Sequence, residues 1–372
     1  MFKMKEKYPI AIEIGDRHVF AAQLQKTRRG IAVRDLFHQE LNDSQPDSAE
    51  SEEALVQACK AVAKHSGFKG KNAAILLPSR HVNCFPLTFE ALDSESVEDA
   101  IVRECRKLIS FPLEKAVIDY PSIVEISADN KRRFRASIVA VHRDQVDRHI
   151  RLLKKAGLSV EAIDFDLLAL LRLHRYLFSL KEDPIIFCNI GYQRSLMAIV
   201  TRESILAQRN THWGIQGLLS RLQTNFEFSA SSDQAAAMLS KYGLMYESYL
   251  ESADDLPDKK KAVLGDDQGI YRTVFQILTP YMDVLIHEFY QTIGYVRSEL
   301  QTARFDELFL YGQAGAINFL EPYLESRINI PVTCINPMLK LALSDGDTLS
   351  DSARGGPFAL ALGLAMRKVT WL

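Results

Sequence analysis

Two stretches of the chain share one pattern of apolar and polar positions. Residues 9–25 (PIAIEIGDRHVFAAQLQ) and 184–200 (PIIFCNIGYQRSLMAIV) each hold an apolar run, an Ile-Gly corner, a polar turn and a second apolar run. The pattern predicts a β-hairpin in each stretch, and Gly15 supplies backbone freedom at the first bend.

The two predicted hairpins can be aligned on their Ile-Gly corners. Glu13 then matches Asn189, and Asp16 matches Tyr192. A hairpin of this kind near the start of each half favours a duplicated architecture. The alternative stays open, because any two hairpins with an Ile-Gly corner would look similar.

The segments after the first hairpin alternate between strand and helix patterns. Residues 30–39 predict a third strand, apolar positions at helical spacing in residues 55–62 predict a helix, and residues 72–78 predict a short strand. Residues 80–160 then follow a βαββα pattern of their own. Its first helix is capped by Asp93 or Ser94 in this interpretation. The order is typical of an α/β unit with a mixed sheet and an insertion.

The second half contains a glycine pair, a long helix and a glycine loop. Gly214 and Gly217 precede a helical stretch, and residues 278–300 form one long amphipathic helix that tolerates Pro280 near its first turns or as a kink. Residues 307–311 predict a buried strand that runs into the small-residue loop Gly312-Gln313-Ala314-Gly315-Ala316. Such a loop lets a phosphate approach backbone N–H groups.

Composition indicates a soluble protein of about two to three domains, because 372 residues exceed one ordinary core. A net charge of −2 supplies no overall field for nucleic acid or an anionic membrane. Five scattered cysteines without a C-x-x-C pair fit a reducing compartment. No apolar run approaches the ~20 residues of a membrane span. We therefore expect a cytoplasmic protein that meets a membrane only through a partner.

Other chemistries find no support in the motifs. The sequence has no G-x-S-x-G, H-E-x-x-H or Walker lysine motif, and no aromatic-basic stripe for nucleic acid. The histidines show no ligand spacing, and we interpret His18 as an exposed turn residue. For Asp164 and Asp166, in AIDFD, helix capping is the preferred interpretation.

The ordered landmarks of the whole chain resemble the type IV pilus assembly protein PilM family, a relative of the cell-division protein FtsA in the actin-like ATPase superfamily. The segments that carry the resemblance are IEIG with its hairpin, FPLEKAVIDY, AVHRDQVDRHIRLLKKAGLSVEAIDFD, NIGYQRSLMAIV, LYGQAGA and INIPVTCINP. The resemblance implies an actin-like α/β fold with two duplicated RNase-H-like halves, a nucleotide cleft between them, and an FtsA/PilM-type inserted subdomain.

The resemblance also implies domain limits. The first half covers residues 1–79 and is completed by about 161–183 and 350–372. The inserted subdomain covers residues 80–160, and the second half covers residues 184–349.

By the same resemblance, the cleft would take ATP or ADP with Mg²⁺. The positions that match the family's nucleotide loops are Glu13, Gly15, Asp16, Asn189, Gly191, Gly214, Gly312, Gln313 and Gly315. Here the sequence departs from the family. Phe20 stands where the first loop has a lysine, and Asn189 replaces an aspartate. Because phosphoryl transfer depends on placed charges and a metal, we expect a degenerate cleft that does not hydrolyse ATP.

The function implied is a cytoplasmic scaffold at the inner face of the inner membrane, within a type IV pilus or related secretion or adhesion machine. Its partner would be the cytoplasmic N-terminal tail of a PilN-like membrane protein, bound in a groove between the first half and the inserted subdomain. The pilus motor ATPase is a further candidate partner.

Three alternatives remain open at the level of sequence. The first is an active ATPase or sugar-kinase-like enzyme, which would need the charges that Phe20 and Asn189 remove. An FtsA-like polymer would need a terminal amphipathic helix, for which residues 367–372 are too short. A type II secretion platform protein would continue into a membrane helix, which the sequence does not predict.

Overall fold

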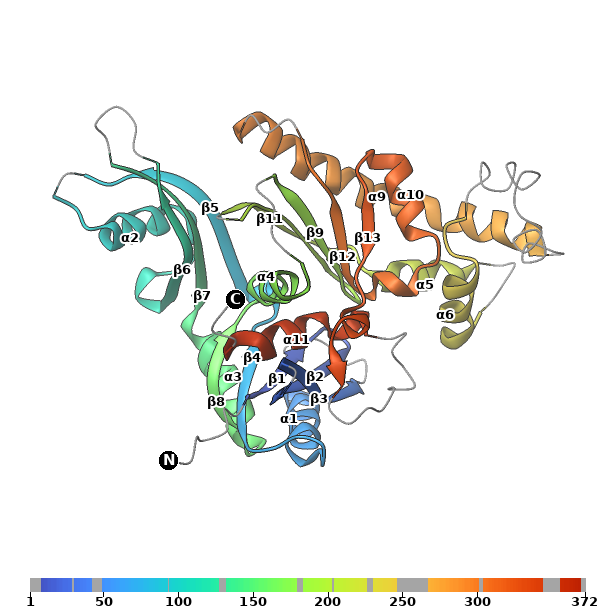
Figure 1. Ribbon diagram of the computed structural model, residues 1–372, viewed down its shortest axis with the longest axis horizontal. Coiled ribbons are helices and arrows are strands. Elements are labelled where there is room, and N and C mark those ends of the chain that lie inside the picture. Colours follow the sequence, from blue (N-terminus) through green and yellow to red (C-terminus); the bar gives the residue numbers. More distant parts are fainter. Residues whose placement is uncertain are drawn as a thin grey trace. The chain divides into compact units, whose positions relative to one another are not determined.

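The computed structural model describes residues 8–28, 30–41, 49–92, 94–126, 132–178, 183–202, 204–225, 230–245, 267–300, 304–343 and 355–368. By its internal contacts the chain divides into two compact units. Unit 1 holds residues 1–184, 198–210 and 336–372, and unit 2 holds residues 185–197 and 211–335. Each unit is described by itself below (Figure 1).

A six-stranded mixed sheet forms the centre of unit 1, with the order β14-β3-β2-β1-β4-β8. Strand β1 pairs antiparallel with β2 and parallel with β4, which in turn pairs parallel with β8. The strands are β1 (Ile10–Ile14), β2 (His18–Thr27), β3 (Gly30–Glu40), β4 (Asn72–Leu76), β8 (Ser159–Asp164) and β14 (Ala342–Leu343).

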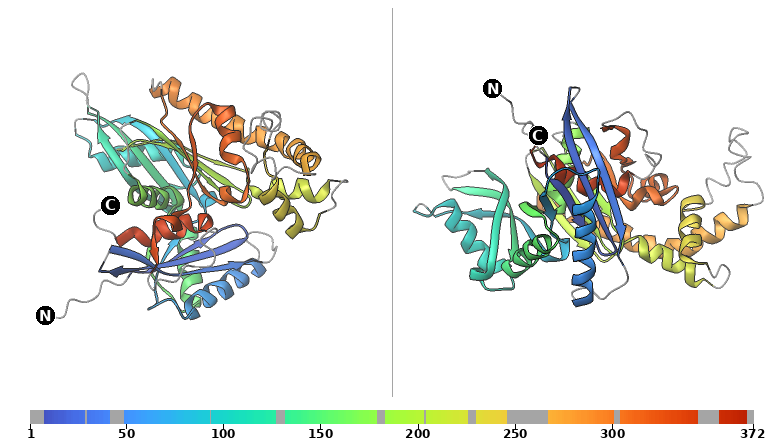
Figure 2. Two further views of the ribbon diagram at one scale, coloured as in Figure 1. Left: turned by 45° about the vertical axis from the view of Figure 1, so that its right-hand side comes forward. Right: turned by 90° about the horizontal axis from the view of Figure 1, so that it is seen from below.

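Helices cover both faces of this sheet. On one face, α1 (Ala49–Lys64) and α3 (Arg143–Lys155) share a core that includes Ile12, Val62 and Leu153. On the other face, α11 (Ala359–Ala365) contacts β1, β2 and α4 (Asp166–Leu177). Figure 2 shows α1 and α11 on opposite sides of the sheet. Burial of apolar surface on both faces explains why β1 reads as a nearly continuous apolar run.

Residues 82–155 follow the βαββα order, and their strands form a second, three-stranded sheet with the order β5-β7-β6. The elements are β5 (Val82–Glu90), α2 (Val97–Leu108), β6 (Ala116–Glu125), β7 (Arg133–His142) and α3. Helix α2 packs on this sheet, but α3 contributes to the core of the six-stranded sheet. The limits 80 and 160 of an inserted subdomain stay a prediction.

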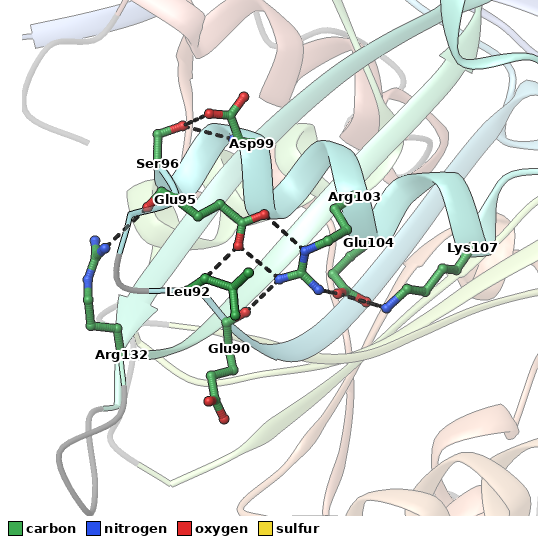
Figure 3. A network of polar contacts seen from close by, with 9 residues as sticks. All are labelled: Glu90, Leu92, Glu95, Ser96, Asp99, Arg103, Glu104, Lys107 and Arg132. Atoms are coloured by element: carbon green, nitrogen blue, oxygen red, sulfur yellow. Dashed lines mark hydrogen bonds and ion pairs between the residues drawn. The ribbon is translucent and has the colours of Figure 1, made fainter.

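The start of α2 is fixed by side chains other than the two predicted. The N-cap is Ser96, whose Oγ accepts a hydrogen bond from the Asp99 amide at 3.0 Å, so a cap at Asp93 or Ser94 is wrong. Arg103 then holds the preceding loop, because it donates to Glu95 Oε1 at 2.9 Å and to the Glu90 carbonyl at 2.7 Å. Figure 3 shows this network around the first turns of α2.

The five-stranded sheet has the order β11-β10-β9-β12-β13. Its central strand β9 pairs parallel with β12, and β12 pairs parallel with β13. The strands are β9 (Ile185–Ile190), β10 (Ser195–Val200), β11 (Ile205–Thr211), β12 (Leu308–Gly312) and β13 (Val332–Cys334). The same order of a three-strand meander followed by two parallel strands occurs in β3-β2-β1-β4-β8, so the predicted duplication is confirmed.

Unit 2 also holds four helices in its described part: α5 (Ile215–Thr224), α6 (Ser232–Lys241), α9 (Gln268–Leu300) and α10 (Leu320–Ile328). Helix α9 begins ten residues earlier than the predicted start at Leu278, so Pro280 lies in the helix interior and not in its first turns. Among the described helices, none combines the length and the apolarity that crossing a bilayer requires.

Candidate functional site

The two Ile-Gly corners form turns of the same geometry. The Gly15 amide donates to the His18 carbonyl at 2.9 Å, and the Gly191 amide donates to the Arg194 carbonyl at 3.0 Å. A Cβ atom would lie 3.2 Å from the His18 oxygen at Gly15 and 2.4 Å from the Arg194 oxygen at Gly191. Neither glycine has a left-handed φ. The close approach of the backbone therefore requires glycine at Gly191 and makes Gly15 a tight position. The backbone freedom predicted for Gly15 is not used.

Glu13 is the next-to-last residue of β1, and its Oε2 atom is buried inside unit 1. Its Oε2 atom has no hydrogen-bond partner, whereas the Ala361 amide of α11 donates to the carboxyl group. Burial raises the pKa of Glu13 well above its ordinary value, and the nearby Asp166 carboxyl raises it further. A buried carboxyl group in these surroundings resists ionisation.

Asp164 and Asp166 flank the start of α4 but do not cap it. The N-cap is Phe165, which makes no side-chain capping bond, so the capping interpretation is wrong. The buried Asp164 carboxyl group instead accepts hydrogen bonds from the Phe165 amide at 2.9 Å, from Arg367 at 2.7 Å and from Arg172.

Asp166, the first residue of α4, is a further carboxyl group that interacts electrostatically with Glu13. Burial is the main cause that raises the pKa of Asp166 to about 7, and the Asp16 and Asp164 carboxyl groups raise it further. Among the described residues, no three His, Cys, Asp or Glu side chains are placed to hold a metal ion. Glu13, Asp16 and Asp166 therefore share an electrostatic environment without forming a ligand set.

The charged side chains of the first turn pair with residues outside the turn. Asp16 accepts from Arg80 at 3.4 Å, and Arg17 donates to Glu40 at 2.7 Å. Phe20, in place of a lysine, is buried with its ring stacked on His38 at 4.7 Å between centroids.

His18 lies in the same aromatic cluster. Its Nδ1 atom is 3.0 Å from His38 Nε2, and burial together with the His38 charge lowers the pKa of His18 to about 4. The side chain is half-buried, so the prediction of an exposed His18 is wrong.

Asn189 and Gly312 lie side by side in unit 2. Asn189 is buried at the end of β9, and its Oδ1 atom has no hydrogen-bond partner. Gly312 has φ +69°, and a Cβ atom there would lie 2.4 Å from the Ile190 oxygen and 2.7 Å from Asn189 Oδ1. Only glycine fits this position. Gln313 is half-buried in the following 3-10 turn, and Gly315 is exposed with open space around it.

The N-terminus of α5 uses its own donors internally. The Ile215 amide donates to the Gly191 carbonyl at 3.1 Å, and the Gln216 amide donates to the Tyr192 carbonyl at 2.9 Å. The Gly214 amide donates to the Tyr281 hydroxyl at 3.2 Å. The N–H groups that a helix N-terminus offers to a phosphate are thus already bonded to the second turn and to α9.

Two of these features were not predicted from the sequence. Tyr281 lies on α9, 67 residues from Gly214, and its ring also stacks on Trp213. The ion pair between Asp164 and Arg367 likewise joins residues that are distant in sequence. The pair between Asp164 and Arg172 spans eight residues at the start of α4, and this spacing is a local signal.

The ligand that the fold implies is a nucleoside triphosphate with Mg²⁺. A phosphate requires cations or N–H donors. In the first turn, Arg17 is paired with Glu40, and the Arg80 side chain next to that turn is paired with Asp16. The Ile215 and Gln216 amides at the start of α5 are bonded to carbonyl groups. The unpartnered atoms are the acceptors Glu13 Oε2 and Asn189 Oδ1.

Solved structures share this architecture. A structure described as a PilM-PilN type IV pilus biogenesis complex aligns with a TM-score of 0.74 at 17% identity, over 97% of this chain and 98% of that chain. The ethanolamine utilization protein EutJ from Carboxydothermus hydrogenoformans aligns with a TM-score of 0.53 at 10% identity, over 98% and 91%. MreB5 of Spiroplasma citri bound to ADP aligns with a TM-score of 0.51 at 9% identity, over 98% and 97%.

These similarities, together with the two matching sheets, define an actin-like α/β protein, as predicted. Residues 11–252 and 245–369 match the family described as type IV pilus assembly protein PilM. The chain belongs to the PilM family, which confirms the resemblance found in the sequence.

Proposed function

We propose that the protein is a cytoplasmic scaffold of the inner-membrane platform of a type IV pilus, and that it keeps the actin-like frame without hydrolysing ATP. Membership of the PilM family supports a role in type IV pilus assembly. The observation that carries the proposal is the internal use of the amide donors at the N-terminus of α5. The amides of Gly214, Ile215 and Gln216 are satisfied by the protein itself.

One side chain from each hairpin supports the absence of hydrolysis. Phe20 offers no charge to a phosphate and is packed between His38 and Phe358. Asn189 supplies no carboxylate for a metal-bound water. Phosphoryl transfer relies on metal ions and placed charges for most of its acceleration, so a frame without them hydrolyses poorly even if a nucleotide binds.

The proposed partner is the N-terminal cytoplasmic tail of a PilN-like membrane protein. The similar solved structure with 98% coverage is described as a PilM-PilN complex, which favours such a partner. An extended tail binds well where strand edges are available. The three-stranded sheet of unit 1 supplies β5 and β6 as its two edge strands, and this sheet belongs to the segment that we predicted as the insertion.

Binding of the tail is tested with the purified chain and a synthetic peptide of the PilN-like tail from the same genome. We expect retention of the chain by the immobilised peptide and no retention by a peptide of scrambled order. Absence of binding at millimolar peptide would count decisively against the scaffold role.

Hydrolysis is tested separately by phosphate release from ATP with Mg²⁺. We expect no turnover above the rate of a protein-free control. Steady turnover that disappears in a Glu13→Ala variant would refute the proposal and favour the enzyme alternative. Turnover that persists in that variant would identify a contaminating ATPase.

A further inference from the structure

Three turns at one end of the six-stranded sheet carry cationic side chains without any acidic residue. They connect β2 with β3, α1 with β4, and α3 with β8, and residues 26–34, 64–72 and 154–160 contain no Asp or Glu. We name their exposed cations the basic edge: Lys26, Arg28, Lys64, Lys69, Lys71, Lys154 and Lys155. The net charge of −2 for the whole chain hides this local excess.

The topology brings these turns together. Asn72 is paired with Ser159, and Ile10 with Ala73, so the parallel strands begin at the same edge of the sheet. The Ser159 amide also donates to the Lys71 carbonyl at 2.8 Å. The basic edge therefore lies at the amino ends of the parallel strands, away from the carboxyl ends, where Glu13 and Asp164 lie.

Side-chain contacts hold the turns in place. The buried Gln23 side chain of β2 donates to the Lys69 carbonyl at 2.8 Å and accepts from the Lys69 amide at 2.7 Å. Arg34 of β3 donates to the Gly67 carbonyl at 3.0 Å. The basic edge is thus a fixed backbone surface from which flexible side chains extend.

Local structure explains only part of this charge. Lys64, Lys154 and Lys155 lie in the last turns of helices, where cations interact favourably with the helix dipole. Lys155 also forms an ion pair with Glu52 at 3.0 Å. Lys69 and Lys71 lie on a turn, outside any helix, so the helix dipole does not account for them.

The surroundings of the basic edge select one kind of partner. The large hydrophobic side chains exposed in the described part of the chain lie elsewhere, namely Leu92, Val102, Leu108, Val284, Tyr290, Tyr295 and Leu339. Protein interfaces and single-stranded nucleic-acid sites depend on aromatic or apolar anchors. Lysines are hydrated point charges on flexible stems, which suit a diffuse anionic surface. Clusters of about four to eight such cations are typical of contacts with anionic lipids.

We propose that the basic edge is a direct contact surface for anionic phospholipid headgroups. This inference rests on the proposed function, which brings the protein to a membrane through its partner. Contact through the basic edge orients unit 1 with the amino ends of β1, β4 and β8 towards the bilayer. The turn after Glu13 then faces away from it.

The test is co-sedimentation of the full chain with vesicles of phosphatidylcholine mixed with phosphatidylglycerol, and with vesicles of phosphatidylcholine alone. We expect binding to the anionic vesicles only, weakened by added salt. Neutralising three cations, with Lys69→Gln, Lys71→Gln and Lys154→Gln combined, is expected to lower the apparent affinity about 100-fold.

A matched variant controls for net charge. Arg106→Gln, Lys115→Gln and Arg202→Gln combined change exposed cations of unit 1 outside the basic edge by the same total charge. We expect this variant to bind like the unchanged chain. Equal binding to neutral vesicles, or an equal loss in both variants, would overturn the proposal. Tighter lysine-dependent binding to a DNA duplex than to anionic vesicles would also overturn it and make nucleic acid the partner.

Tail-peptide binding separates this inference from the function on which it rests. The variant with Lys69, Lys71 and Lys154 neutralised is expected to bind the PilN-like tail peptide normally. Lysine-dependent vesicle binding without peptide binding would refute the proposed partner and keep the basic edge. Peptide binding without vesicle binding would refute the basic edge alone.

Discussion

Glu13 and Asn189 occupy equivalent places, each at the end of the first strand of a hairpin and each with one oxygen that lacks a hydrogen-bond partner. An unpartnered buried acceptor costs free energy that a core residue would avoid. Both residues match nucleotide-loop positions of the family, and each places a hydrogen-bond acceptor at its position. In contrast, the Gly15 and Gly191 amides, two residues further along the chain, donate within their own turns.

The conformation of Gly312 leads to a first prediction. At φ +69°, a Cβ atom would lie 2.4 Å from the Ile190 oxygen of the neighbouring strand. Gly312→Ala is therefore expected to lower the free energy of unfolding by about 2 kcal/mol or more. Urea denaturation measures the change.

Gly315→Ala is the matched control for Gly312→Ala. It lies in the same loop, and a Cβ atom there would meet nothing within 4 Å. We expect it to change the free energy of unfolding by less than about 0.5 kcal/mol. Equal effects of the two substitutions would contradict the described backbone conformation.

The raised pKa of Asp166 makes stability depend on pH. Burial holds this pKa at about 7 in the folded chain, compared with about 3.9 for an unfolded aspartate. As the pH rises from about 4 to about 7, the unfolded state loses its proton first, so this residue lowers stability progressively and most fully above pH 7.

Asp166→Asn removes that titration. We compare the free energy of unfolding of the variant with that of the unchanged chain. The gain in stability caused by the substitution is expected to be about 2 to 4 kcal/mol larger at pH 8 than at pH 5. Denaturant unfolding of both proteins at the two pH values measures this gain. The same relative stability at both pH values would show that Asp166 is not held neutral by its surroundings.

At the scale of elements, α9 contains a proline in its interior. Pro280 has no N–H group to donate to the Gln276 carbonyl, and its side chain is exposed. The adjacent Tyr281 nevertheless contacts Trp213 and the start of α5. The helix thus carries a local defect beside the contact that satisfies the Gly214 amide.

Pro280→Ala is expected to raise the free energy of unfolding by about 1 to 3 kcal/mol, because it restores a helical hydrogen bond. Val284→Ala, also exposed on α9, is the control and should have little effect. Thermal unfolding of both variants tests this. A lower melting temperature for Pro280→Ala would mean that the native position of Tyr281 depends on the proline.

At the scale of the whole molecule, much of the fold was predictable from the sequence. Paired apolar runs predicted the hairpins, and the shared Ile-Gly corners predicted the duplication that the two strand orders confirm. The packing of α3 was not predictable from its own spacing. An apolar helix face can pack on any apolar surface, so the spacing does not identify the sheet that α3 covers. Only the structure shows that Leu153 joins the core of the six-stranded sheet.

For three glycines of the candidate site, proximity to the second hairpin was predictable, but the hydrogen bonds around them were not. The family resemblance gave the loop residues, since Gly191, Gly214 and Gly312 all lie against the second hairpin. The internal use of the α5 amides depends on Tyr281, far along the chain. The hydrogen bonding of Asp164 depends on Arg367, close to the last described residues. Local patterns carry no signal for contacts over such distances.

The most direct test of the scaffold account is a calorimetric titration of the full chain with the PilN-like tail peptide, performed without nucleotide and again with ATP and Mg²⁺. The account predicts saturable binding in both titrations with the same affinity, and no heat of hydrolysis. Peptide binding that requires ATP, or continuous heat release from ATP, would contradict it.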